Sequence, residues 1–328
     1  MALNAPLNVH WELTNLCNLN CVHCYQQDDG PRRGLPRSDL LDTIARRIMD
    51  ADVFEVTLTG GEVLLVPQLR DIVRHFNSHG LRPHITSNGM LVNDEKADWL
   101  AAADITFQVS LDAADPTRHN AVRRSPFAYQ RALEGVTRLV ERGVEVSFAY
   151  TAMPDNLEEI EGVLAVAAER GVGRVCVGEV LPEFGGAANR RRLEMAAEPF
   201  GRFVAGLGEL RERYRGRVDL VAALLSGHLH DRRLRASPCT ALERDLAILH
   251  DGWAYPCPFV RDRRQRLGDV RQHDLRTIWA GPSALRFREE KRTQSTKHCV
   301  STASHPGPVL LQLGARPTTA EPGDQETS

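Results

Sequence analysis

The sequence has no long apolar run, no basic N-terminal stretch and no excess of charge of one sign. No apolar segment approaches the ~18 residues that a membrane-spanning helix needs, so we expect no association with a membrane. Residues 1–13 contain neither a basic region nor an extended apolar region, which argues against a secretory signal peptide. We therefore expect a cytoplasmic protein whose seven cysteines are reduced rather than paired in disulfides.

The balance of charge also limits the partners. The 328 residues include 41 Lys and Arg and 43 Asp and Glu, which gives a formal net charge of −2. A general nucleic-acid-binding protein carries a clear basic excess, so we expect no nucleic-acid partner. Arginines cluster at 190–192 and at 261–266, and we interpret both clusters as solvated surface. With 42% hydrophobic residues, the chain can still bury a sizeable core.

Three cysteines lie close together near the N-terminus. Cys17, Cys21 and Cys24 have the spacing C-x3-C-x2-C, directly after an apolar run at 7–13 that predicts a buried strand. Three thiolates on one short loop can bind three irons of a four-iron cluster and leave the fourth iron open to a small molecule. A zinc site with His23 as its fourth ligand is the alternative that these residues leave open.

Short β-branched runs alternate with longer amphipathic segments as far as residue 180. The predicted strands are 7–13, 53–58, 81–86, 105–111, 144–151 and 174–180. The predicted helices are 38–50 with Ser38 as its N-cap, 67–78, 93–101, 127–142 and 156–170. This alternation is typical of an α/β fold with a parallel sheet, which either closes into a full or partial barrel or remains open.

Polar residues and glycines follow several of these predicted strands. Gly60-Gly61-Glu62 comes after the second strand, Ser87-Asn88-Gly89 after the third, and Ser110-Leu111-Asp112 ends the fourth. The functional residues of parallel α/β folds lie at the carboxyl ends of the strands. We therefore expect these segments and the cysteine loop to share one rim.

The alternation stops near residue 185. Beyond it we predict helices at 191–214, 220–229 and 275–292, and a β-hairpin within 238–259 that turns at Asp251-Gly252. Cys239 and Cys257 flank that hairpin, and Cys299 follows the last helix. Cys176 lies inside an apolar predicted strand, and we interpret it as a buried core thiol. Residues 300–328 lack aromatic side chains and are rich in Pro, Gly, Thr and Ala, so we expect disorder there.

The cysteine loop and the Gly-Gly-Glu segment together resemble the radical S-adenosylmethionine (SAM) superfamily, over residues 7–299. The resemblance implies a partial (β/α)6 TIM-like barrel that binds a [4Fe-4S] cluster and SAM. The implied cluster ligands are Cys17, Cys21 and Cys24, and His23 fills the position before the third cysteine, which is aromatic-like in the family. The methionyl amino group of SAM would contact the segment Gly60, Gly61 and Glu62.

Further SAM-binding residues are implied by the same resemblance. Asn88, Ser110 and Asp112 match the family's ribose-facing positions. Arg123 lies in HNAVRR, which is similar to the family's HxxxRG element, and would bind the SAM carboxylate. The glycine of that element is replaced here by Arg124.

The segment from Cys239 through HDGWAYPC to LGDV and LRTIW resembles the start of a SPASM or twitch domain. Such domains bind auxiliary four-iron clusters, so the resemblance implies Cys239, Cys257 and Cys299 as ligands of an auxiliary [4Fe-4S] cluster; the alternative is that the three are unmetallated. A full SPASM domain has further cysteines after this point, and the sequence has none beyond Cys299. One hypothesis is a frameshifted or truncated gene, which the downstream DNA would reveal in its other frames.

These observations predict four parts. They are a radical SAM partial barrel at 1–184, a helical linker at 185–236, an incomplete SPASM- or twitch-like hairpin and helix extension at 237–299, and a disordered tail at 300–328.

The resemblance implies reductive cleavage of SAM to a 5′-deoxyadenosyl radical that abstracts hydrogen from a ribosomally made peptide. Two alternatives stay open: oxidative modification of a tetrapyrrole or other small cofactor precursor, and a non-catalytic, metal-stabilised scaffold. The expected partners are the peptide or small-molecule substrate and an electron donor such as flavodoxin or ferredoxin. No peptide-recognition segment precedes the first strand, so we expect a separate protein to bind a leader peptide.

Overall fold

The computed structural model describes residues 3–26, 34–180, 189–224, 240–293 and 309–310. In these residues one 11-stranded sheet runs in the order β10-β9-β8-β1-β2-β3-β4-β5-β6-β7-β11. The strands are β1 (Asn8–Thr14), β2 (Glu55–Gly60), β3 (His84–Ser87), β4 (Thr106–Ser110), β5 (Glu145–Ala152), β6 (Arg174–Glu179), β7 (Asp219–Leu224), β8 (Asp245–Ile248), β9 (Trp253–Tyr255), β10 (Gly268–Asp269) and β11 (Val309–Leu310).

The helices follow the strands in alternation. They are α1 (Ser38–Asp50), α2 (Leu69–Ser78), α3 (Asp94–Ala101), α4 (Pro116–Arg123), α5 (Ala128–Glu141), α6 (Ile160–Glu169), α7 (Arg190–Leu193), α8 (Ala197–Tyr214), α9 (Leu275–Ala280) and α10 (Pro282–Thr293). Short 3-10 helices lie at η1 (Val63–Leu65), η2 (Leu157–Glu159) and η4 (Arg263–Gln265).

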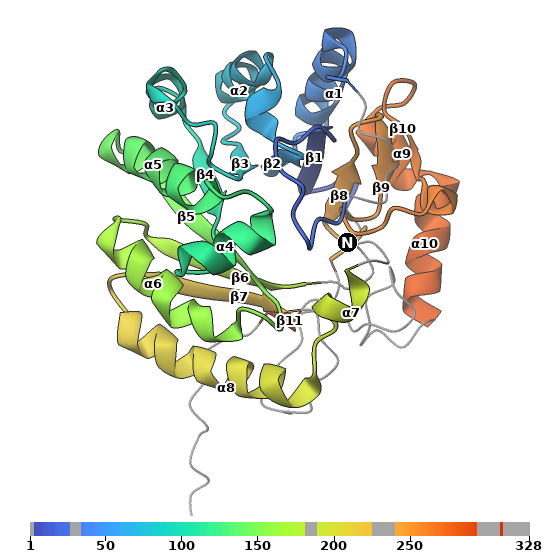
Figure 1. The fold of residues 1–328 in the computed structure, drawn as a ribbon. Coiled ribbons are helices and arrows are strands. Elements are labelled where there is room, and N and C mark those ends of the chain that lie inside the picture. Colours follow the sequence, from blue (N-terminus) through green and yellow to red (C-terminus); the bar gives the residue numbers. More distant parts are fainter. Residues whose placement is uncertain (1–2, 27–33, 181–188, 225–239, 294–308, 311–328) are drawn as a thin grey trace, which may run out of the picture.

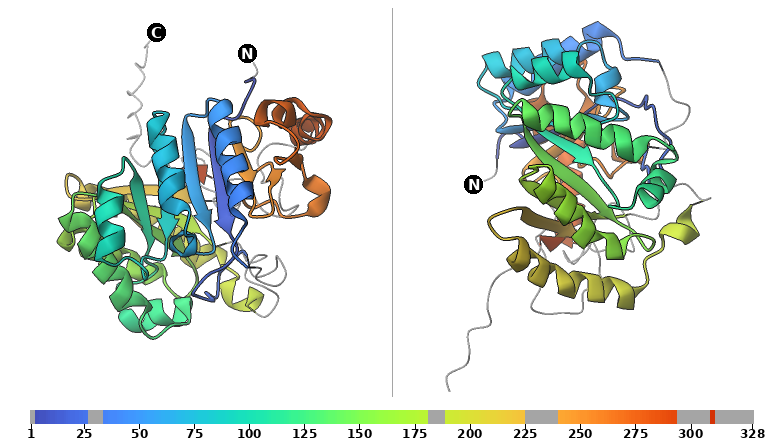
Figure 2. Two further views of the ribbon diagram at one scale, coloured as in Figure 1. Left: turned by 90° about the horizontal axis from the view of Figure 1, so that it is seen from above. Right: turned by 60° about the vertical axis from the view of Figure 1, so that its left-hand side comes forward.

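Strands β1 to β7 are parallel to one another, and β8 joins the outer side of β1 in the same direction. Strands β9, β10 and β11 pair in antiparallel fashion. The sheet curves, and helices α1, α2, α3, α5, α6 and α8 cover its convex side (Figure 1). The fold is therefore an α/β partial barrel, as the family resemblance implied, with the extension that carries β8 to β10, α9 and α10 attached at its β1 edge (Figure 2).

The two faces of the sheet differ in polarity. In β1, Val9, Trp11 and Leu13 are buried in the main hydrophobic cluster between the sheet and the helices. Because side chains alternate along a strand, His10 and Glu12 point to the concave face instead. Burying the apolar side chains provides the main stabilisation of the fold, at roughly 25 cal/mol per Å², and leaves polar side chains on the concave side.

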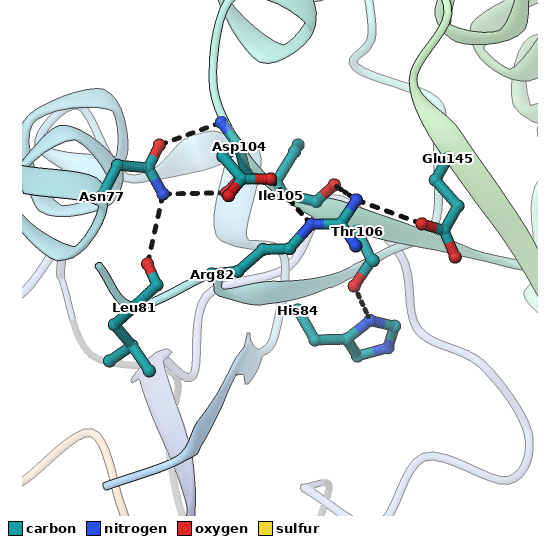
Figure 3. A network of polar contacts seen from close by, with 8 residues as sticks. All are labelled: Asn77, Leu81, Arg82, His84, Asp104, Ile105, Thr106 and Glu145. Atoms are coloured by element: carbon teal, nitrogen blue, oxygen red, sulfur yellow. Dashed lines mark hydrogen bonds and ion pairs between the residues drawn. The ribbon is translucent and has the colours of Figure 1, made fainter. Parts of the chain in front are cut away.

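A network of polar contacts connects the amino-terminal ends of three neighbouring strands (Figure 3). Arg82 pairs with Asp104 at 2.8 Å and with Glu145 at 3.1 Å, and it also donates to the carbonyl oxygen of Ile105 at 2.9 Å. Asn77 of α2 donates to the carbonyl oxygen of Asp104 at 2.8 Å and accepts from its N–H at 3.0 Å. These contacts link the starts of β3, β4 and β5.

Several predicted elements are confirmed and others are wrong. The hairpin that turns at Asp251-Gly252 is formed by β8 and β9. The helix predicted at 220–229 is wrong over its described part, which is the parallel strand β7. The helix predicted at 275–292 is two helices that break at Gly281, because the following proline starts a new helix.

Smaller corrections concern a missed helix, a cap and a cysteine. Helix α4, which follows β4, was not predicted. The N-cap of α1 is Arg37, whose side chain makes no cap bond, and Ser38 is the first helical residue. Cys176 is half-buried, because its position in β6 alternates with the buried Val175 and Val177. It therefore belongs to the concave face and not to the apolar core.

Candidate active site

A cavity of ≈ 380 Å³ lies at the carboxyl ends of the parallel strands. The predicted site residues that line it are Cys17, Cys21, His23, Cys24, Gly60, Gly61, Asn88, Ser110 and Arg123. Of the residues that the structure describes, Glu62 and Asp112 are the two predicted SAM-binding residues outside this lining. The wall also contains residues that the sequence did not indicate, among them Tyr25, Thr59, Thr86, Gln108, Thr151, Glu179 and Phe259.

The cysteine loop is held against the end of β2 by backbone contacts. The N–H of Gly61 donates to the carbonyl oxygen of Thr14 at 2.7 Å, and the N–H of Glu62 donates to that of Leu16 at 2.7 Å. A Cβ on Gly61 would lie 2.0 Å from the oxygen of Leu16. At Gly60, where φ is +135°, a Cβ would lie 2.4 Å from the oxygen of Thr14. The two glycines are therefore needed for the loop to approach the strand.

Polar groups surround the first cysteine. The N–H of Leu19 donates to Sγ of Cys17 at 3.4 Å, and Nδ2 of Asn88 lies 4.0 Å from the same sulfur. Asn88 also donates to Oδ1 of Asn18 at 2.8 Å, and this bond holds the cysteine loop against the loop that follows β3. Burial raises the pKa of the Cys17 thiol to about 12. Because metals bind the thiolate form, binding at this sulfur releases its proton.

Glu62 lies behind the cavity wall. Its side chain is fully buried and accepts from the N–H of Leu64 at 3.0 Å, the hydroxyl of Ser87 at 2.8 Å and the N–H of Asn88 at 2.9 Å. Burial raises the pKa of this carboxyl above its ordinary value. These contacts fasten the loop after β3 to the loop after β2. The contact between the segment Gly60, Gly61 and Glu62 and the SAM amino group stays a prediction.

Asp112 is also buried and does not reach the cavity. Its side chain is 0% exposed and pairs with Arg123, with 2.7 Å between Oδ2 and Nη2. Burial alone would raise the pKa of Asp112, but the charge of Arg123, the two nearby histidines and the N–H of Thr151 together outweigh burial and leave that pKa below its ordinary value. Asp112 is not among the residues that line the cavity, and its expected position facing the ribose stays a prediction. Asn88 and Ser110, the other two residues expected to face the ribose, do line the cavity.

Arg123 joins this buried ion pair to the cysteine loop. Its Nη1 donates to Sγ of Cys21 at 3.7 Å. Its Nε is buried and has no hydrogen-bond partner among the residues that the structure describes. Nδ1 of His23, also on the cavity wall, is likewise buried without a partner in that part of the chain, and burial lowers the pKa of His23 to about 4. Both residues line the cavity, and both retain one buried nitrogen whose hydrogen-bonding capacity is unused in the described part of the chain.

The C-terminal extension completes one wall of the cavity. Phe259 contacts the edge of Tyr25, with 6.1 Å between the ring centroids. The guanidinium of Arg261 lies 4.6 Å from the Tyr25 ring and pairs with the buried carboxylate of Glu12 in β1. Tyr25 directly follows the third cysteine, a signal that sequence reasoning overlooked. No sequence signal pairs Glu12 with Arg261, which lies 249 residues away.

Of the three cysteines predicted to bind an auxiliary cluster, the structure describes one, Cys257. Cys257 is half-buried after β9 and packs against a small cluster of buried side chains. Cys239 and Cys299 lie outside the described residues.

The residues present fit a cluster with SAM beside it. Three cysteines converge on one cavity that also contains unpartnered buried nitrogens. Within the described ranges, no group of three or more His, Cys, Asp or Glu side chains could hold a single metal ion. A four-iron cluster does not require such a group, because each thiolate binds a different iron.

Comparisons with known proteins agree with this geometry. Residues 11–167 match a model of the radical SAM superfamily, and residues 239–300 match the SPASM iron-sulfur cluster-binding domain. An "AdoMet-dependent heme synthase" of Methanosarcina barkeri is 34% identical over 173 residues, which cover 51% of this chain and 49% of the relative. The sporulation killing factor maturation protein SkfB of Bacillus subtilis is 24% identical over 253 residues, 77% of this chain and 60% of the relative.

The fold has solved counterparts as well. Streptococcus suis SuiB bound to SAM has a TM-score of 0.77 at 16% identity, over 92% of this chain and 76% of SuiB. The structure of anSMEcpe with bound AdoMet has a TM-score of 0.69 at 16% identity, over 86% of this chain and 79% of that one. The chain spans about half the length of the M. barkeri relative and less than two thirds of SkfB.

Among the helices that the structure describes, none combines the length and the apolar character needed to cross a bilayer.

A radical SAM domain implies a [4Fe-4S] cluster and SAM as cofactors, and a SPASM domain implies an auxiliary cluster. The chain belongs to the radical SAM superfamily of enzymes, with a radical SAM domain followed by a SPASM domain.

Proposed function

We propose that this protein reductively cleaves SAM and uses the radical to abstract hydrogen from a ribosomally made peptide. The observation that carries the proposal is one cavity lined by Cys17, Cys21 and Cys24 together with Gly60 and Gly61. In this proposal the protein acts in the cytoplasm with a donor such as flavodoxin or ferredoxin, and a separate protein recognises the leader of the peptide.

The residues of the site have distinct parts in this proposal. Cys17, Cys21 and Cys24 would hold the cluster, which when bound supplies the electron that splits the sulfonium of SAM. Tyr25 and Phe259 close one wall with aromatic rings and exclude water from the cavity. Exclusion of water matters because it protects a reactive intermediate from side reactions.

Peptide substrates are supported by the relatives. SkfB is named as a maturation protein, and SuiB has been solved bound to its precursor peptide SuiA. A second candidate, oxidation of a tetrapyrrole, is favoured by the 34% identity to the M. barkeri heme synthase.

The cluster is tested by anaerobic reconstitution with iron and sulfide. Cys21→Ala removes a cavity cysteine, and Cys176→Ala is its matched control on the concave face outside the cavity lining. We expect Cys21→Ala to lose the iron and the visible absorbance of the cluster at the three-cysteine site, and Cys176→Ala to keep both. Equal loss in the two variants would contradict the assignment.

The substrate is tested by isotope transfer. A deuterated candidate peptide, encoded beside this gene, is incubated with the reconstituted protein, SAM and dithionite. We expect deuterium in the 5′-deoxyadenosine that mass spectrometry recovers. Deuterium from a labelled tetrapyrrole precursor in place of the peptide would contradict the peptide proposal and support the second candidate.

A further inference from the structure

A buried pair of opposite charges lies directly behind one cluster cysteine. Arg123 is the last residue of α4, and Asp112 follows β4. Their side chains are 8% and 0% exposed, and 2.7 Å separates Nη2 from Oδ2. The other terminal nitrogen of Arg123, Nη1, lies 3.7 Å from Sγ of Cys21. One guanidinium therefore bridges a carboxylate and the sulfur of a predicted cluster ligand.

The surroundings fix this arrangement. The N–H of Thr151 donates to Oδ1 of Asp112 at 3.3 Å, and Nδ2 of Asn156 donates to the backbone oxygen of Asp112 at 2.8 Å. The N–H of Asp112 donates to Nδ1 of His119 at 3.2 Å. Asp112 is thus held by both its side chain and its backbone, and it holds Arg123 toward the cysteine loop.

A backbone hydrogen bond also holds the cysteine loop close to Arg123. The N–H of Val22, next to Cys21, donates to the carbonyl oxygen of Val122 at 2.9 Å. Val22 and Val122 also share a small cluster of buried apolar side chains with Leu193 of α7. The charge of Arg123 is therefore fixed near Cys21 in a region with little water, where charges interact more strongly than in solvent.

We propose that Arg123 is a positioning residue that sets the reduction potential of the cluster through Cys21, and that Asp112 limits its effect. Reduction adds one negative charge to the cluster, so a buried cation that donates to a ligand sulfur stabilises the reduced form. The carboxylate of Asp112 has the opposite effect because its charge is negative, and it acts from the other terminal nitrogen of the same guanidinium. The inference rests on the proposed cluster at Cys17, Cys21 and Cys24.

Removing either charge should shift the midpoint potential of the cluster, in opposite directions for the two residues. Arg123→Met removes the cation and leaves the anion, so the midpoint potential becomes more negative. Asp112→Asn removes the anion and leaves the cation, so the potential becomes less negative. The double variant removes both charges and returns toward the wild-type value. We expect each single shift to reach about tenfold in the equilibrium constant for one-electron reduction, which corresponds to ~59 mV.

The measurement is a dithionite titration of the reconstituted protein without SAM, followed by electron paramagnetic resonance of the reduced cluster. Arg118→Met is the matched control, because Arg118 lies on the same helix with its side chain 48% exposed; its potential is expected to stay at the wild-type value. Arg123→Lys keeps the charge and serves as a second variant if Arg123→Met fails to fold. Its potential is expected to lie between those of the wild type and of Arg123→Met.

The outcomes separate the possible roles. Loosening of the loop would shift the potential in the same direction in both single variants, and this result would overturn the proposal. Unchanged potentials together with weaker binding of SAM to Arg123→Met would also overturn it, because Arg123 would then act on SAM alone. A wild-type protein that assembles no cluster would contradict the proposed function itself, whereas a loaded wild type with unmoved variants contradicts only this inference.

Discussion

At the scale of single residues, Arg124 shows how a departure from a family pattern is accommodated. It follows α4 in the left-handed conformation, with φ 53° and ψ 42°, where the family's element has glycine. Its Nη2 donates to Oδ1 of Asn189 at 3.0 Å. The backbone thus keeps the conformation that suits glycine, and the side chain gains a contact with the residue before α7.

Two substitutions at this position separate the backbone from the side chain. Arg124→Gly and Arg124→Ala both lose the bond to Asn189, but only alanine retains a Cβ in the left-handed region. We expect Arg124→Gly to be more stable than Arg124→Ala by about 1 kcal/mol. Urea denaturation of the two apo-proteins checks this, and equal stability would show that the left-handed backbone carries no strain.

His119 makes the stability of the fold depend on pH. Its side chain is buried and its Nδ1 accepts the N–H of Asp112, and burial together with the charge of Arg123 lowers the pKa of His119 to about 3. The unfolded chain, with an ordinary pKa of 6.5, binds a proton in the window between these values. The free energy of unfolding should therefore fall as the pH is lowered from about 6.5 toward 3.

The slope attributable to His119 is up to about 1.4 kcal/mol per pH unit. His119→Asn keeps an acceptor at the δ position and does not titrate in this range. We expect its unfolding free energy, measured in urea between pH 7 and pH 5, to fall less steeply than that of the wild type. Parallel slopes would contradict the buried, neutral state of His119.

Most of the residues that the sequence predicted for the site do line one cavity. The contacts that each of them makes there could not be predicted from the sequence. Cys17, Cys21 and Cys24 carry their spacing in the sequence, and the structure gathers them on one cavity. Glu62 and Asp112 are predicted to contact SAM, and the structure adds that both are buried and bound by protein groups. Their partners are Asn88, 26 residues away in the loop after β3, and Arg123, 11 residues away at the end of α4. Which of these segments become neighbours depends on the order of the strands in the sheet.

At the scale of elements, the approach of the cysteine loop to β2 depends on glycine. Gly61→Ala would place a Cβ against the backbone oxygen of Leu16, which cannot move without shifting the loop. Gly173→Ala is the matched control, because a Cβ there meets nothing within 4 Å. We expect Gly61→Ala to lose about 1–3 kcal/mol of unfolding free energy, and to bind less iron on reconstitution than Gly173→Ala. Equal behaviour of the two variants in both measurements would contradict this packing.

Helices and strands were predictable where the spacing of apolar residues and the residues that flank the segment indicated the same element. Helix 38–50 has the predicted bounds, because its apolar spacing is strong and a polar stretch precedes it. Strand β7 was predicted as a helix, since its run DLVAAL is apolar without strict alternation. A strand in a parallel sheet is covered on both faces and need not alternate, so local pattern alone could not separate the two.

At the scale of the whole molecule, the extension and the barrel form one sheet. Strand β8 pairs with β1, and Arg261 beyond the hairpin reaches the fully buried Glu12 of β1. Arg261 also stacks on Tyr25, next to the third cysteine of the loop. The extension is thus tied to the same strand that carries the cysteine loop, a connection that no local sequence pattern encodes.

This connection predicts a large effect of one substitution. Arg261→Met removes the cation that pairs with Glu12 and should lower the unfolding free energy by about 3–5 kcal/mol, because a charge in a buried pair is costly without its partner. Adding Glu12→Gln should recover most of that loss. If the double variant is no more stable than Arg261→Met, the ion pair is not the source of the effect. Denaturation of the three proteins in urea gives the comparison.

The central claim is that the cavity at the carboxyl ends of the strands generates a radical from SAM. The most direct measurement is formation of 5′-deoxyadenosine by the anaerobically reconstituted protein with SAM and dithionite, quantified by liquid chromatography and mass spectrometry. We predict product from the wild type and from Cys176→Ala, and none from Cys21→Ala. A wild-type protein that carries its cluster but forms no 5′-deoxyadenosine, or a Cys21→Ala variant that forms as much as the wild type, would contradict the claim.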